Sequence, residues 1–508
     1  MAPVDPSPTH LVDLRPRLGS RLVADFTASR PKHPPVSLPT YDRSIITGGI
    51  THLGVGGFHR AHLAVYLDDL LCSGASTWSV TGSGVMAHDE KVAAVLREQD
   101  GLYLLAEREG ADVHARIVGS IGSFVPAHFD PVPLLRHLVD PITKIVSMTL
   151  TEGGYPVEHG SFAESPELKL DVLREVPRTT FGILIEALDS RRKAGLAPFT
   201  VMSCDNLPGN GNVARIAVIK TAALRSSDLA KWLEANGAFP NSMVDRITPT
   251  TTDADREWVA DTFGFVDGWP VVCEPFRQWA LEDHFVDGRP PFEEVGVLMT
   301  QDVIPYEHMK LRLLNASHSG LAYHAALAGI TYVHDAVLDK RVEAFMRRFM
   351  ADEASPNLVA PAGIDLSEYQ DSLVHRFSNP AISDTIARLC LDGTAKFPTF
   401  LVPTIEAQLE NGGSIRMVAL VLAGWCRYLR GTADDGSALV LSNDPFLAEA
   451  TDIARRSVSD PGMFLRYERA LGPNIGQSTR LLDAFTEALT SLDQHGSLAT
   501  LDEWTRVA

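Results

Sequence analysis

The pattern of apolar residues changes near residue 300, and this change restricts the chain to a small set of architectures. Before it, short apolar runs alternate with stretches of helical periodicity, which is typical of a mainly parallel sheet covered by helices. After Tyr306 the periodicity is almost entirely helical. We therefore predict an α/β domain followed by a mostly α-helical domain. The predicted strands include residues 50–53, 79–81, 144–150, 199–204 and 270–273, and the predicted helices include residues 341–350, 381–391, 415–429 and 480–492.

Length and composition agree with two globular domains. The chain has 508 residues, of which 45% are hydrophobic and 21% are charged, so a large buried core can form. We place an N-terminal arm at residues 1–45, the α/β domain at residues 46–299 and the helical domain at residues 300–508.

The charge balance excludes several classes of partner. The 45 basic and 64 acidic residues give a formal net charge of −19, and such a field repels phosphate backbones and anionic membranes. We expect neither nucleic acid nor a membrane as partner. A small uncharged molecule is compatible with this field, whereas an anionic one needs a local cluster of arginine or lysine.

Cysteine use and the N-terminal segment indicate a cytoplasmic protein. The cysteines are far apart in the sequence, which favours neither a disulfide framework nor a cysteine-rich zinc site, and we expect them to be reduced core residues. The first 45 residues carry no apolar run typical of a signal peptide, and no run of about eighteen apolar residues follows. The cysteines are Cys72, Cys204, Cys273, Cys390 and Cys426.

A glycine-rich segment, THLGVGGFHRAH at residues 51–62, follows a predicted strand and precedes a predicted helix. A dinucleotide-binding turn needs this setting, because glycines such as Gly54 and Gly56 let the backbone approach a pyrophosphate and the helix N-terminus offers N–H groups to it. His59 stands where the usual fingerprint has its third glycine. On spacing alone, a purely structural glycine turn is an equal alternative.

An acid that reads the adenosine ribose should follow the second strand, and Asp89 in TGSGVMAHDE is our candidate. A carboxylate there accepts hydrogen bonds from the ribose diol and repels a 2′-phosphate, which favours NAD over NADP. The neighbouring His88 supplies no second negative charge. The alternative role for Asp89 is that of a helix-capping residue.

Polar residues recur along the predicted helix at residues 306–320, YEHMKLRLLNASHSG. In an α-helix, Glu307, Lys310, Asn315 and His318 fall within an arc of roughly 140°. Apolar neighbours indicate that this helix is largely buried, although a solvated polar face would also explain the two charged residues. A lysine held there would have a lowered pKa and could accept a proton from an alcohol near neutral pH.

Asn206 follows another predicted strand, in the segment MSCDN. Ligands of open α/β sheets bind beyond the carboxyl ends of strands, so Asn206 should lie near a substrate. Together with Asn315 it could donate hydrogen bonds to an oxygen that gains negative charge in the transition state. Each asparagine alone would more simply be a turn or cap residue.

Several ordered motifs resemble those of the mannitol dehydrogenase family, the polyol-specific long-chain dehydrogenases. They extend from about residue 45 almost to the C-terminus, so the resemblance is highly specific. It implies a Rossmann-type first domain, a helical second domain, an active site between them and no metal. The matching motifs are GVGGFHRAH (54–62), LTEGGYP (150–156), FTVMSCDNLPGNG (199–211), MVDRITP (243–249), WPVVCEPF (269–276) and the K-x4-N-x2-H pattern from Lys310 to His318.

The resemblance also implies a reaction and a role for each residue. The family oxidises a polyol such as D-mannitol to the ketose D-fructose with NAD, and the reverse, and we expect a monomer. Lys310 resembles the general base, Asn206 and Asn315 the pair that holds the reacting oxygen, His318 the residue that orients the substrate, and Glu307 the proton relay to solvent. Asp245, Arg388 and Lys396 resemble polyol contacts. The residues implied in cofactor binding are Gly54, Val55, Gly56, Gly57, Phe58, His59, Arg60 and Asp89.

Two other functions are open at this point, and a third lacks the residues that it needs. A sugar-acid reductase of the same superfamily would use Arg277, Arg388 and Lys396 together against a substrate carboxylate. A non-catalytic dinucleotide sensor would keep the glycine turn but would not need the catalytic set. A zinc alcohol dehydrogenase would need cysteine ligands near a catalytic histidine, and the spacings do not supply them.

Overall fold

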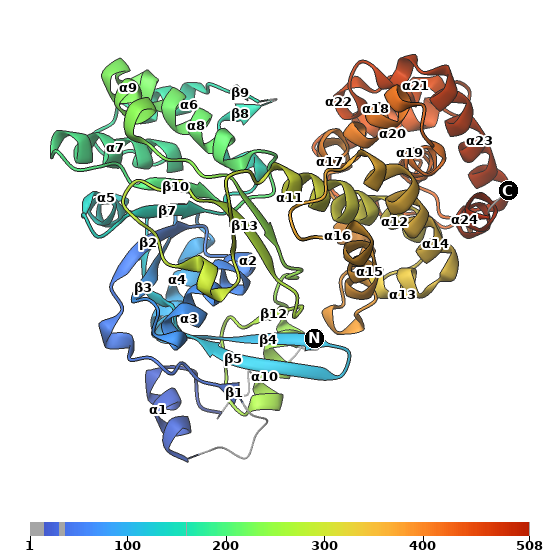
Figure 1. The fold of residues 1–508 in the computed structure, drawn as a ribbon. Helices are drawn as coiled ribbons and strands as arrows, with labels where there is room; N and C mark the ends of the chain where they lie inside the picture. The colour runs from blue at the N-terminus through green and yellow to red at the C-terminus, as the bar shows by residue number, and fades with distance from the viewer. Residues whose placement is uncertain (1–14, 30–35, 159, 507–508) are drawn as a thin grey trace, which may run out of the picture.

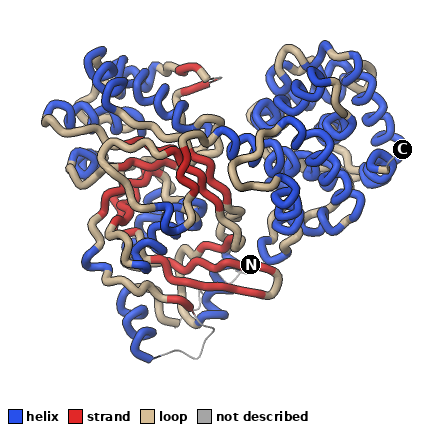
Figure 2. The backbone as a smooth tube through the Cα atoms, viewed as in Figure 1, coloured by secondary structure: helices blue, strands red, loops and turns tan. Residues whose placement is uncertain are grey.

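The computed structural model describes residues 15–29, 36–158 and 160–506. Its strands lie in the N-terminal part of the chain, the last of them being β14 (Leu298–Thr300), and helices follow from α11 (Ile304–Met309) onward. The two parts stand side by side in Figure 1, and Figure 2 shows the strands gathered in the first part. The predicted fold class, an α/β domain followed by a helical domain, is confirmed.

A five-stranded parallel sheet forms the centre of the first part, in the order β10-β7-β2-β3-β6. The chain runs outward from β2 through β3 to β6 and then returns to the other side of β2 for β7 and β10. This reversal is the switch point at which doubly wound sheets bind dinucleotides. The strands are β2 (Gly48–Leu53), β3 (Trp78–Gly84), β6 (Ile121–Pro126), β7 (Ile145–Met148) and β10 (Thr200–Ser203).

Helices cover both faces of this sheet, because its strands carry apolar side chains on both faces. Residues of α3 (Leu63–Ser73) and α4 (Asp89–Glu98) share a core with Ile50 and Val80. On the other face lie α5 (Val132–Val139), α7 (Thr180–Lys193), α8 (Asn210–Arg225) and α9 (Ser227–Asn236), whose core contains Val146 and Val201. Four of the five predicted strands, at 50–53, 79–81, 144–150 and 199–204, belong to this sheet.

The fifth predicted strand, 270–273, is a strand but was assigned to the wrong sheet. As β12 (Val271–Cys273) it pairs in parallel with β4 (Tyr103–Glu109), which forms an antiparallel hairpin with β5 (Asp112–Val118). An apolar run shows that a strand is buried but does not specify its partner. The hairpin, which the sequence analysis did not predict, supplies that partner.

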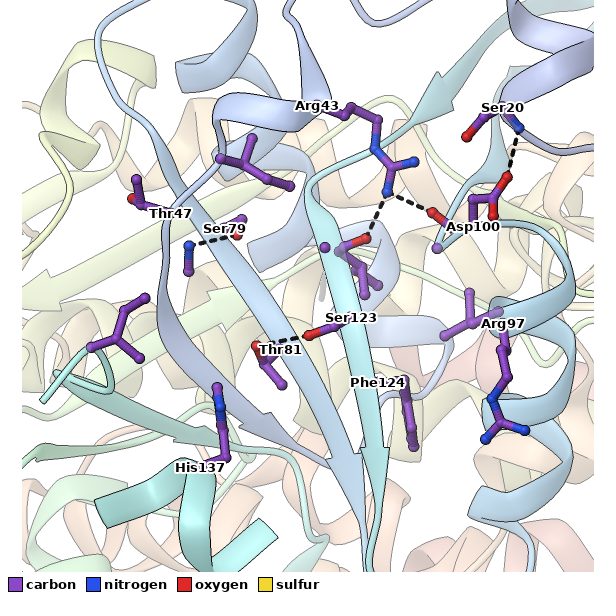
Figure 3. A pocket seen from close by; sticks show the side chains of 17 residues that line it. Ser20, Arg43, Thr47, Ser79, Thr81, Arg97, Asp100, Ser123, Phe124 and His137 are labelled. Atoms are coloured by element: carbon purple, nitrogen blue, oxygen red, sulfur yellow. Dashed lines mark hydrogen bonds between the residues drawn. The ribbon is translucent and has the colours of Figure 1, made fainter. Parts of the chain in front are cut away.

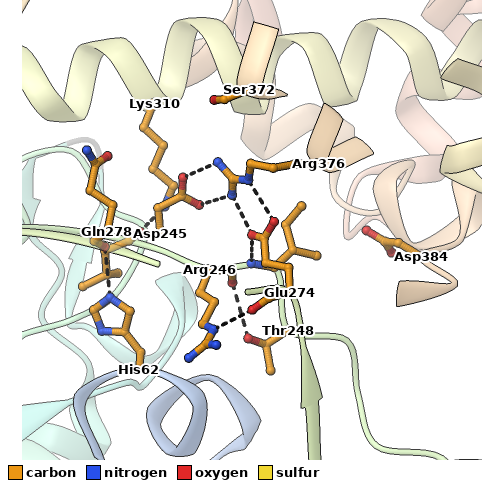
Figure 4. Close-up of polar contacts among 12 residues, drawn as sticks. His62, Asp245, Arg246, Thr248, Glu274, Gln278, Lys310, Ser372, Arg376 and Asp384 are labelled. Carbon is orange, nitrogen blue, oxygen red and sulfur yellow. Dashed lines mark hydrogen bonds and ion pairs between the residues drawn. The ribbon is translucent and has the colours of Figure 1, made fainter. Parts of the chain in front are cut away.

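The remaining described strands form two smaller sheets. In one, β11 (Ser242–Asp245) pairs antiparallel with β13 (Gln278–Glu282), which pairs in parallel with β14. In the other, β8 (Val157–Glu158) pairs with β9 (Ser161–Phe162). The carboxyl end of β11 lies at the boundary with the helical part (Figure 4), and this end carries part of the site.

The described portion of the N-terminal arm packs on the β4–β5 side of the molecule. Helix α1 (Ser20–Ser29) contributes to an apolar cluster with Leu18 and Phe265, and β1 (Val36–Ser37) adds to the edge of β5. Residues 1–14 and 30–35 lie outside the described residues.

Helix α19 (Arg416–Leu429) runs through the core of the helical part, against α12 (Ala316–Leu327) and α23 (Thr479–His495). The predicted helices at 341–350, 415–429 and 480–492 are present as α14 (Lys340–Arg348), α19 and α23. The other α-helices described in this part are α13 (Val333–Leu338), α15 (Leu366–Phe377), α16 (Ile386–Leu389), α17 (Gly393–Phe400), α18 (Val402–Asn411), α20 (Leu447–Arg456), α21 (Gly462–Leu465), α22 (Glu468–Leu471) and α24 (Ser497–Thr505). The first part also contains α2 (Gly57–Ala61), α6 (Pro166–Asp171) and α10 (Asp253–Phe263).

The prediction of one continuous helix over 381–391 is wrong. A 3₁₀ turn at Pro380–Ile382 is followed by Ser383 in the left-handed region (φ +51°), and α16 starts only after Thr385. The side chains of Asn379 and Thr385 each accept a hydrogen bond from the backbone of the short element that follows. Such capping residues compete with a continuous helix.

The cysteines were predicted to be unpaired and buried, and the second part of this prediction is wrong for one of them. All five cysteines are free, and four are buried, but Cys72 at the end of α3 is exposed. It occupies the last turn of the helix, where the apolar stripe that faces the sheet has ended.

Candidate active site

The glycine-rich turn at the carboxyl end of β2 requires glycine at its first position. Gly54 has φ +93°, and a Cβ there would lie 2.2 Å from the carbonyl oxygen of Thr149. Its N–H donates to Ser83 (2.9 Å) and its carbonyl accepts from the Thr149 hydroxyl (2.6 Å), so the turn is held between the ends of β3 and β7. Gly56 precedes the short helix α2, which breaks at His62 before α3 begins.

A cavity of about 920 Å³ opens at the carboxyl ends of β2, β3 and β7. Gly54, Gly84, Asp89 and Thr149 line it, together with the segment that follows β7. A cavity of this size at the switch point of a doubly wound sheet suits a dinucleotide. Gly54 supports that fit, because its missing side chain leaves the backbone of the turn open to a phosphate.

Asp89 lies in this cavity as the first residue of α4, and its side chain bonds to the turn that precedes the helix. The carboxylate accepts a hydrogen bond from the N–H of Met86 (2.8 Å), and the Nε2 atom of His88 lies 3.5 Å from Oδ1. The capping alternative is not observed, because His88 holds the N-cap position of α4 and no side chain caps the helix there. Ribose recognition by Asp89 stays a prediction.

The other residues predicted to bind cofactor lie in or beneath the turn. Val55 is buried, Gly56 and Gly57 begin α2, and Phe58 packs against the core. The ring of His59 stacks on His52 with 3.5 Å between centroids, and the guanidinium of Arg60 donates to the carbonyls of Trp269 and Gly56. The side chains of His59 and Arg60 therefore support the turn from below.

A second large cavity, of about 850 Å³, lies at the opposite edge of the sheet, near the amino ends of β2, β3 and β6 (Figure 3). Its hydroxyl groups bond within the protein: Thr81 with Ser123 (3.1 Å) and Ser79 with the N–H of Gly48 (3.0 Å). Arg43 donates to backbone carbonyls. These hydroxyl groups and Arg43 thus have partners within the protein.

Lys310 lies where the helical part meets the strand ends. Its Nζ donates to Oδ1 of Asn206 (2.5 Å), which follows β10, and to the carbonyl of Val244 in β11. The side chain is buried, and Figure 4 shows it reaching from its helix toward β11. The structure therefore brings together the predicted base and one of the two predicted oxygen-binding asparagines.

The helix that carries Lys310 is not regular. Between α11 and α12 the residues Lys310–Asn315 form a π-helical turn with i→i+5 hydrogen bonds, where the sequence analysis expected a continuous α-helix. The wider turn brings residues five apart closer to the same side of the helix than an α-helix does, and this is the separation of Lys310 and Asn315. In the described part of the chain the buried Oδ1 of Asn315 has no hydrogen-bond partner.

Burial lowers the pKa of Lys310, and Arg376 lowers it further, whereas Asp245 and Glu307 act in the opposite direction. Glu307 lies one turn before Lys310, and its carboxylate accepts from the N–H of Gly209 (2.9 and 3.1 Å). Burial raises the pKa of Glu307. The two groups thus have proton affinities shifted toward each other, which suits proton exchange.

His318 is flanked by cations. Its ring stacks on Phe377 (3.9 Å between centroids), and burial together with Arg388, Arg376 and Lys396 holds the pKa of His318 well below its usual range. The imidazole is therefore neutral near pH 7 and can both donate and accept a hydrogen bond. Arg388 is paired with Asp384 (2.6 Å), and Nζ of Lys396 donates to the carbonyl of Leu389 (3.2 Å).

Arg277 lies apart from this group. Its guanidinium pairs with Asp69 of α3 (2.5 Å) and stands 4.4 Å from the centroid of the Tyr66 ring. Of the three cations that a carboxylate-binding site would require, Arg388 and Lys396 act on His318, whereas Arg277 is engaged by Asp69.

Asp245 is held by a residue that the sequence analysis missed. Arg376 of α15 donates to both oxygens of Asp245 (2.9 and 3.0 Å) and to both oxygens of Glu274 (2.7 and 2.9 Å). Burial alone would raise the pKa of Asp245, but Arg376 and Lys310 hold it below its ordinary value. In the sequence, Arg376 resembles any basic residue near the end of a helix. The residues around it therefore do not indicate that it binds Asp245 and Glu274.

Two features of the described residues concern metals and membranes. In those ranges no three His, Cys, Asp or Glu side chains are grouped as ligands for a metal ion. None of the described helices is both long enough and apolar enough to span a membrane.

Family models match both parts of the chain. The mannitol dehydrogenase Rossmann domain matches residues 48–294, and the mannitol dehydrogenase C-terminal domain matches residues 302–493. The chain belongs to the mannitol dehydrogenase family. The resemblance in the sequence motifs is thereby confirmed.

Relatives and solved structures agree with this assignment. The chain is 42% identical over 480 residues to mannitol 2-dehydrogenase of Emericella nidulans, covering 92% of this chain and 95% of that protein. It is 43% identical over 470 residues to mannitol 2-dehydrogenase of Cereibacter sphaeroides, covering 92% and 98%. The structure of Pseudomonas fluorescens mannitol 2-dehydrogenase in ternary complex with NAD and D-mannitol matches with a TM-score of 0.87 and 41% identity, covering 96% of this chain and 99% of that one. A D-sorbitol dehydrogenase in substrate-free form matches with a TM-score of 0.85 and 36% identity, covering 96% and 100%.

The glycine turn generates a paired prediction. Gly54→Ala should lower the free energy of unfolding by about 3 kcal/mol, because it combines a left-handed backbone with a clash against Thr149. Gly56→Ala is the matched control, since its φ is −91° and its Cβ would meet the nearest atom at 3.9 Å. Thermal and urea unfolding of both variants measure the difference. Equal stabilities would contradict this account of the turn.

Proposed function

We propose that this protein is an NAD-dependent mannitol 2-dehydrogenase, which oxidises D-mannitol to D-fructose and catalyses the reverse reduction. The observation that carries the proposal is the buried amine of Lys310, bonded to Asn206 and Val244 at the strand ends. A family member with 41% identity was solved with NAD and D-mannitol. The dinucleotide cavity beside Gly54 and Asp89 supports NAD as cofactor.

The hydrogen bonds of Lys310 suit it to act as a base. A neutral amine has two N–H groups and one lone pair, and two acceptors, Oδ1 of Asn206 and the Val244 carbonyl, satisfy both N–H groups. The lone pair then remains for the proton of the substrate hydroxyl. NAD, when bound, supplies the acceptor for the hydride that leaves the carbinol carbon.

The two asparagines stabilise the oxygen as the carbonyl forms. Because Oδ1 of Asn206 accepts from Lys310, its amide N–H groups are directed elsewhere and can donate to the substrate oxygen. Asn315 lies on the same π-helical turn and supplies the second amide. The proton taken by Lys310 passes to Glu307 and from there to solvent. During reduction both proton transfers run in the opposite direction.

The remaining hydroxyls of the polyol are bound by His318, Asp245, Arg388 and Lys396. A neutral imidazole and an ionised carboxylate offer donors and acceptors for adjacent hydroxyls. The sugar-acid reductase alternative is disfavoured because Arg277, which it needs, is engaged by Asp69. A non-catalytic sensor would have no use for the lysine and asparagine arrangement.

We further propose that the protein acts on small molecules as a cytoplasmic monomer. The net charge of −19 disfavours nucleic acid and anionic membranes, and free buried cysteines agree with a reducing compartment. Analytical ultracentrifugation at micromolar concentration tests the monomer, and a stable dimer would contradict it.

Lys310→Ala should reduce turnover in mannitol oxidation at least about a hundredfold, because the proton acceptor is lost, while NAD binding measured by calorimetry survives. In the unmodified protein, oxidation should rise with pH to a plateau, since only the neutral amine accepts a proton. The midpoint should lie below the usual lysine value of about 10.4, because burial lowers the pKa of Lys310. Near-normal turnover in the variant would remove Lys310 from the mechanism.

Asp89→Ala should narrow the ratio of kcat/KM for NAD to that for NADP, because the carboxylate that repels a 2′-phosphate is removed. His88→Ala, at an exposed position beside it, is the control and should leave the ratio close to its original value. The melting temperatures of both variants separate this effect from loss of the hydrogen bond to Met86. An unchanged ratio in Asp89→Ala would assign ribose recognition to another residue.

Fructose reduction with NADH should have a higher kcat/KM than fructuronate reduction. The reason is that no arginine of the described site offers a free fork to the carboxylate of a substrate. A steady-state screen of fructose, fructuronate, mannitol and sorbitol with both nicotinamide cofactors measures the preference. A clear preference for fructuronate would overturn the substrate and leave the roles of Lys310, Asn206 and Asn315 intact.

A further inference from the structure

Arg376 joins the two parts of the molecule through two buried acids. It belongs to α15 of the helical part, whereas Asp245 ends β11 and Glu274 follows β12 (Figure 4). The side chains of Arg376 and Asp245 are each 4% exposed and that of Glu274 is 2% exposed. The guanidinium also lies 3.9 Å from the centroid of the Phe276 ring, so its face is covered as well as its edge.

This cluster lies directly beside the amine of Lys310. Asp245 follows Val244 in β11, and the Val244 carbonyl accepts a hydrogen bond from Nζ. Asp245 therefore stands near this amine and favours its ammonium form, and Glu274 binds the same guanidinium as Asp245. Without a cation between them, these two carboxylates would repel each other. Arg376 is the cation that separates them.

Charged and titratable groups face Lys310 from several elements. Asp245 of β11 and Glu307 of α11 favour its protonated form, and Arg376 of α15 opposes it. His62, where α2 meets α3, also senses the charge of Lys310, but burial lowers the pKa of His62 to about 3, so it is neutral in the working range. The balance between the neutral and the protonated form of Lys310 therefore depends on how completely the positive charge of Arg376 compensates the negative charge of Asp245.

We propose that Arg376 is a positioning residue of the reaction, which clamps Asp245 and Glu274 across the domain boundary and compensates the negative charge that faces Lys310. The proposal rests on the proposed role of Lys310 as the base. Arg376 gives one N–H to each oxygen of Asp245, which leaves each oxygen a lone pair for a polyol hydroxyl. The same clamp thus serves the base and the substrate contact.

The test compares substitutions of opposite electrostatic sign. Arg376→Met should move the pH midpoint of mannitol oxidation upward by about one unit, because the Asp245 carboxylate then favours the ammonium form of Lys310 without opposition. Glu274→Gln should move it downward, because Arg376 then keeps more of its positive charge uncompensated. Arg376→Lys should leave the midpoint nearly unchanged and raise KM, since a lysine keeps the charge but loses the fork.

A second readout does not depend on catalysis. The pH dependence of acetylation of Lys310 by acetic anhydride in the cofactor-free protein, followed by mass spectrometry, should show the same opposite shifts. A wild-type protein that oxidises no polyol would contradict the proposed function, and the labelling would still measure the effect of Arg376 on the amine.

Asn379→Ala is the matched control. Asn379 also joins the two parts, through the carbonyl of Arg108 (2.8 Å) and the N–H of Gly110 (3.1 Å), but it carries no charge. Its loss should leave the pH midpoint of mannitol oxidation and the pH dependence of Lys310 acetylation unchanged. Equal shifts in Asn379→Ala and Arg376→Met, or no shift in Arg376→Met, would overturn the proposal. If Arg376→Met does not fold, a downward shift in Glu274→Gln supports the proposal and its absence overturns it.

Discussion

The amine of Lys310 is held at the strand ends of one domain, although its backbone belongs to the other. Its acceptors are Asn206, which follows β10, and the Val244 carbonyl in β11, so the arrangement exists only while the domains are docked. Burial makes the charged amine costly, and the two hydrogen bonds satisfy both N–H groups of a neutral amine. Docking of the domains therefore also places the amine that we propose as the base.

Buried ion pairs explain why the docking is specific rather than why it is strong. Removing Arg376, Asp245 and Glu274 from water costs much of what their mutual attraction returns, and apolar residues of similar volume would dock the domains as well. An apolar contact would not orient a carboxylate beside Lys310. Elsewhere the boundary uses less costly links, such as the exposed pair of His375 with Glu109 (2.7 Å).

Local patterns in the sequence predicted the elements and the first contacts of the site, but not their partners in space. The apolar runs located the central strands, and a lysine among apolar helical neighbours indicated a buried base. The run 270–273 joined a different sheet because periodicity carries no pairing information. The left-handed backbone of Ser383 interrupts a predicted helix. His59 is buried against His52, although it stands at a position where the usual fingerprint has glycine. Arg376 could not be found because its two acids are 131 and 102 residues away in the sequence.

Asp205 connects the dinucleotide cavity to the proposed base. Its carboxylate accepts from the N–H groups of Leu150 (3.0 Å) and Thr151 (2.9 Å), in the segment that lines the cavity, and from the hydroxyl of Tyr155 (2.6 Å). Thr151 has φ +65° and ψ 168°, a conformation that costs a residue other than glycine about 1–3 kcal/mol. The hydrogen bonds to Asp205 maintain this strained conformation. Because Asn206 is the next residue, Asp205 joins the cavity wall to the proposed donor to the substrate oxygen. Hydride transfer requires the two reactants at a fixed separation. In the proposed reaction this connection would set the position of one reactant relative to the other.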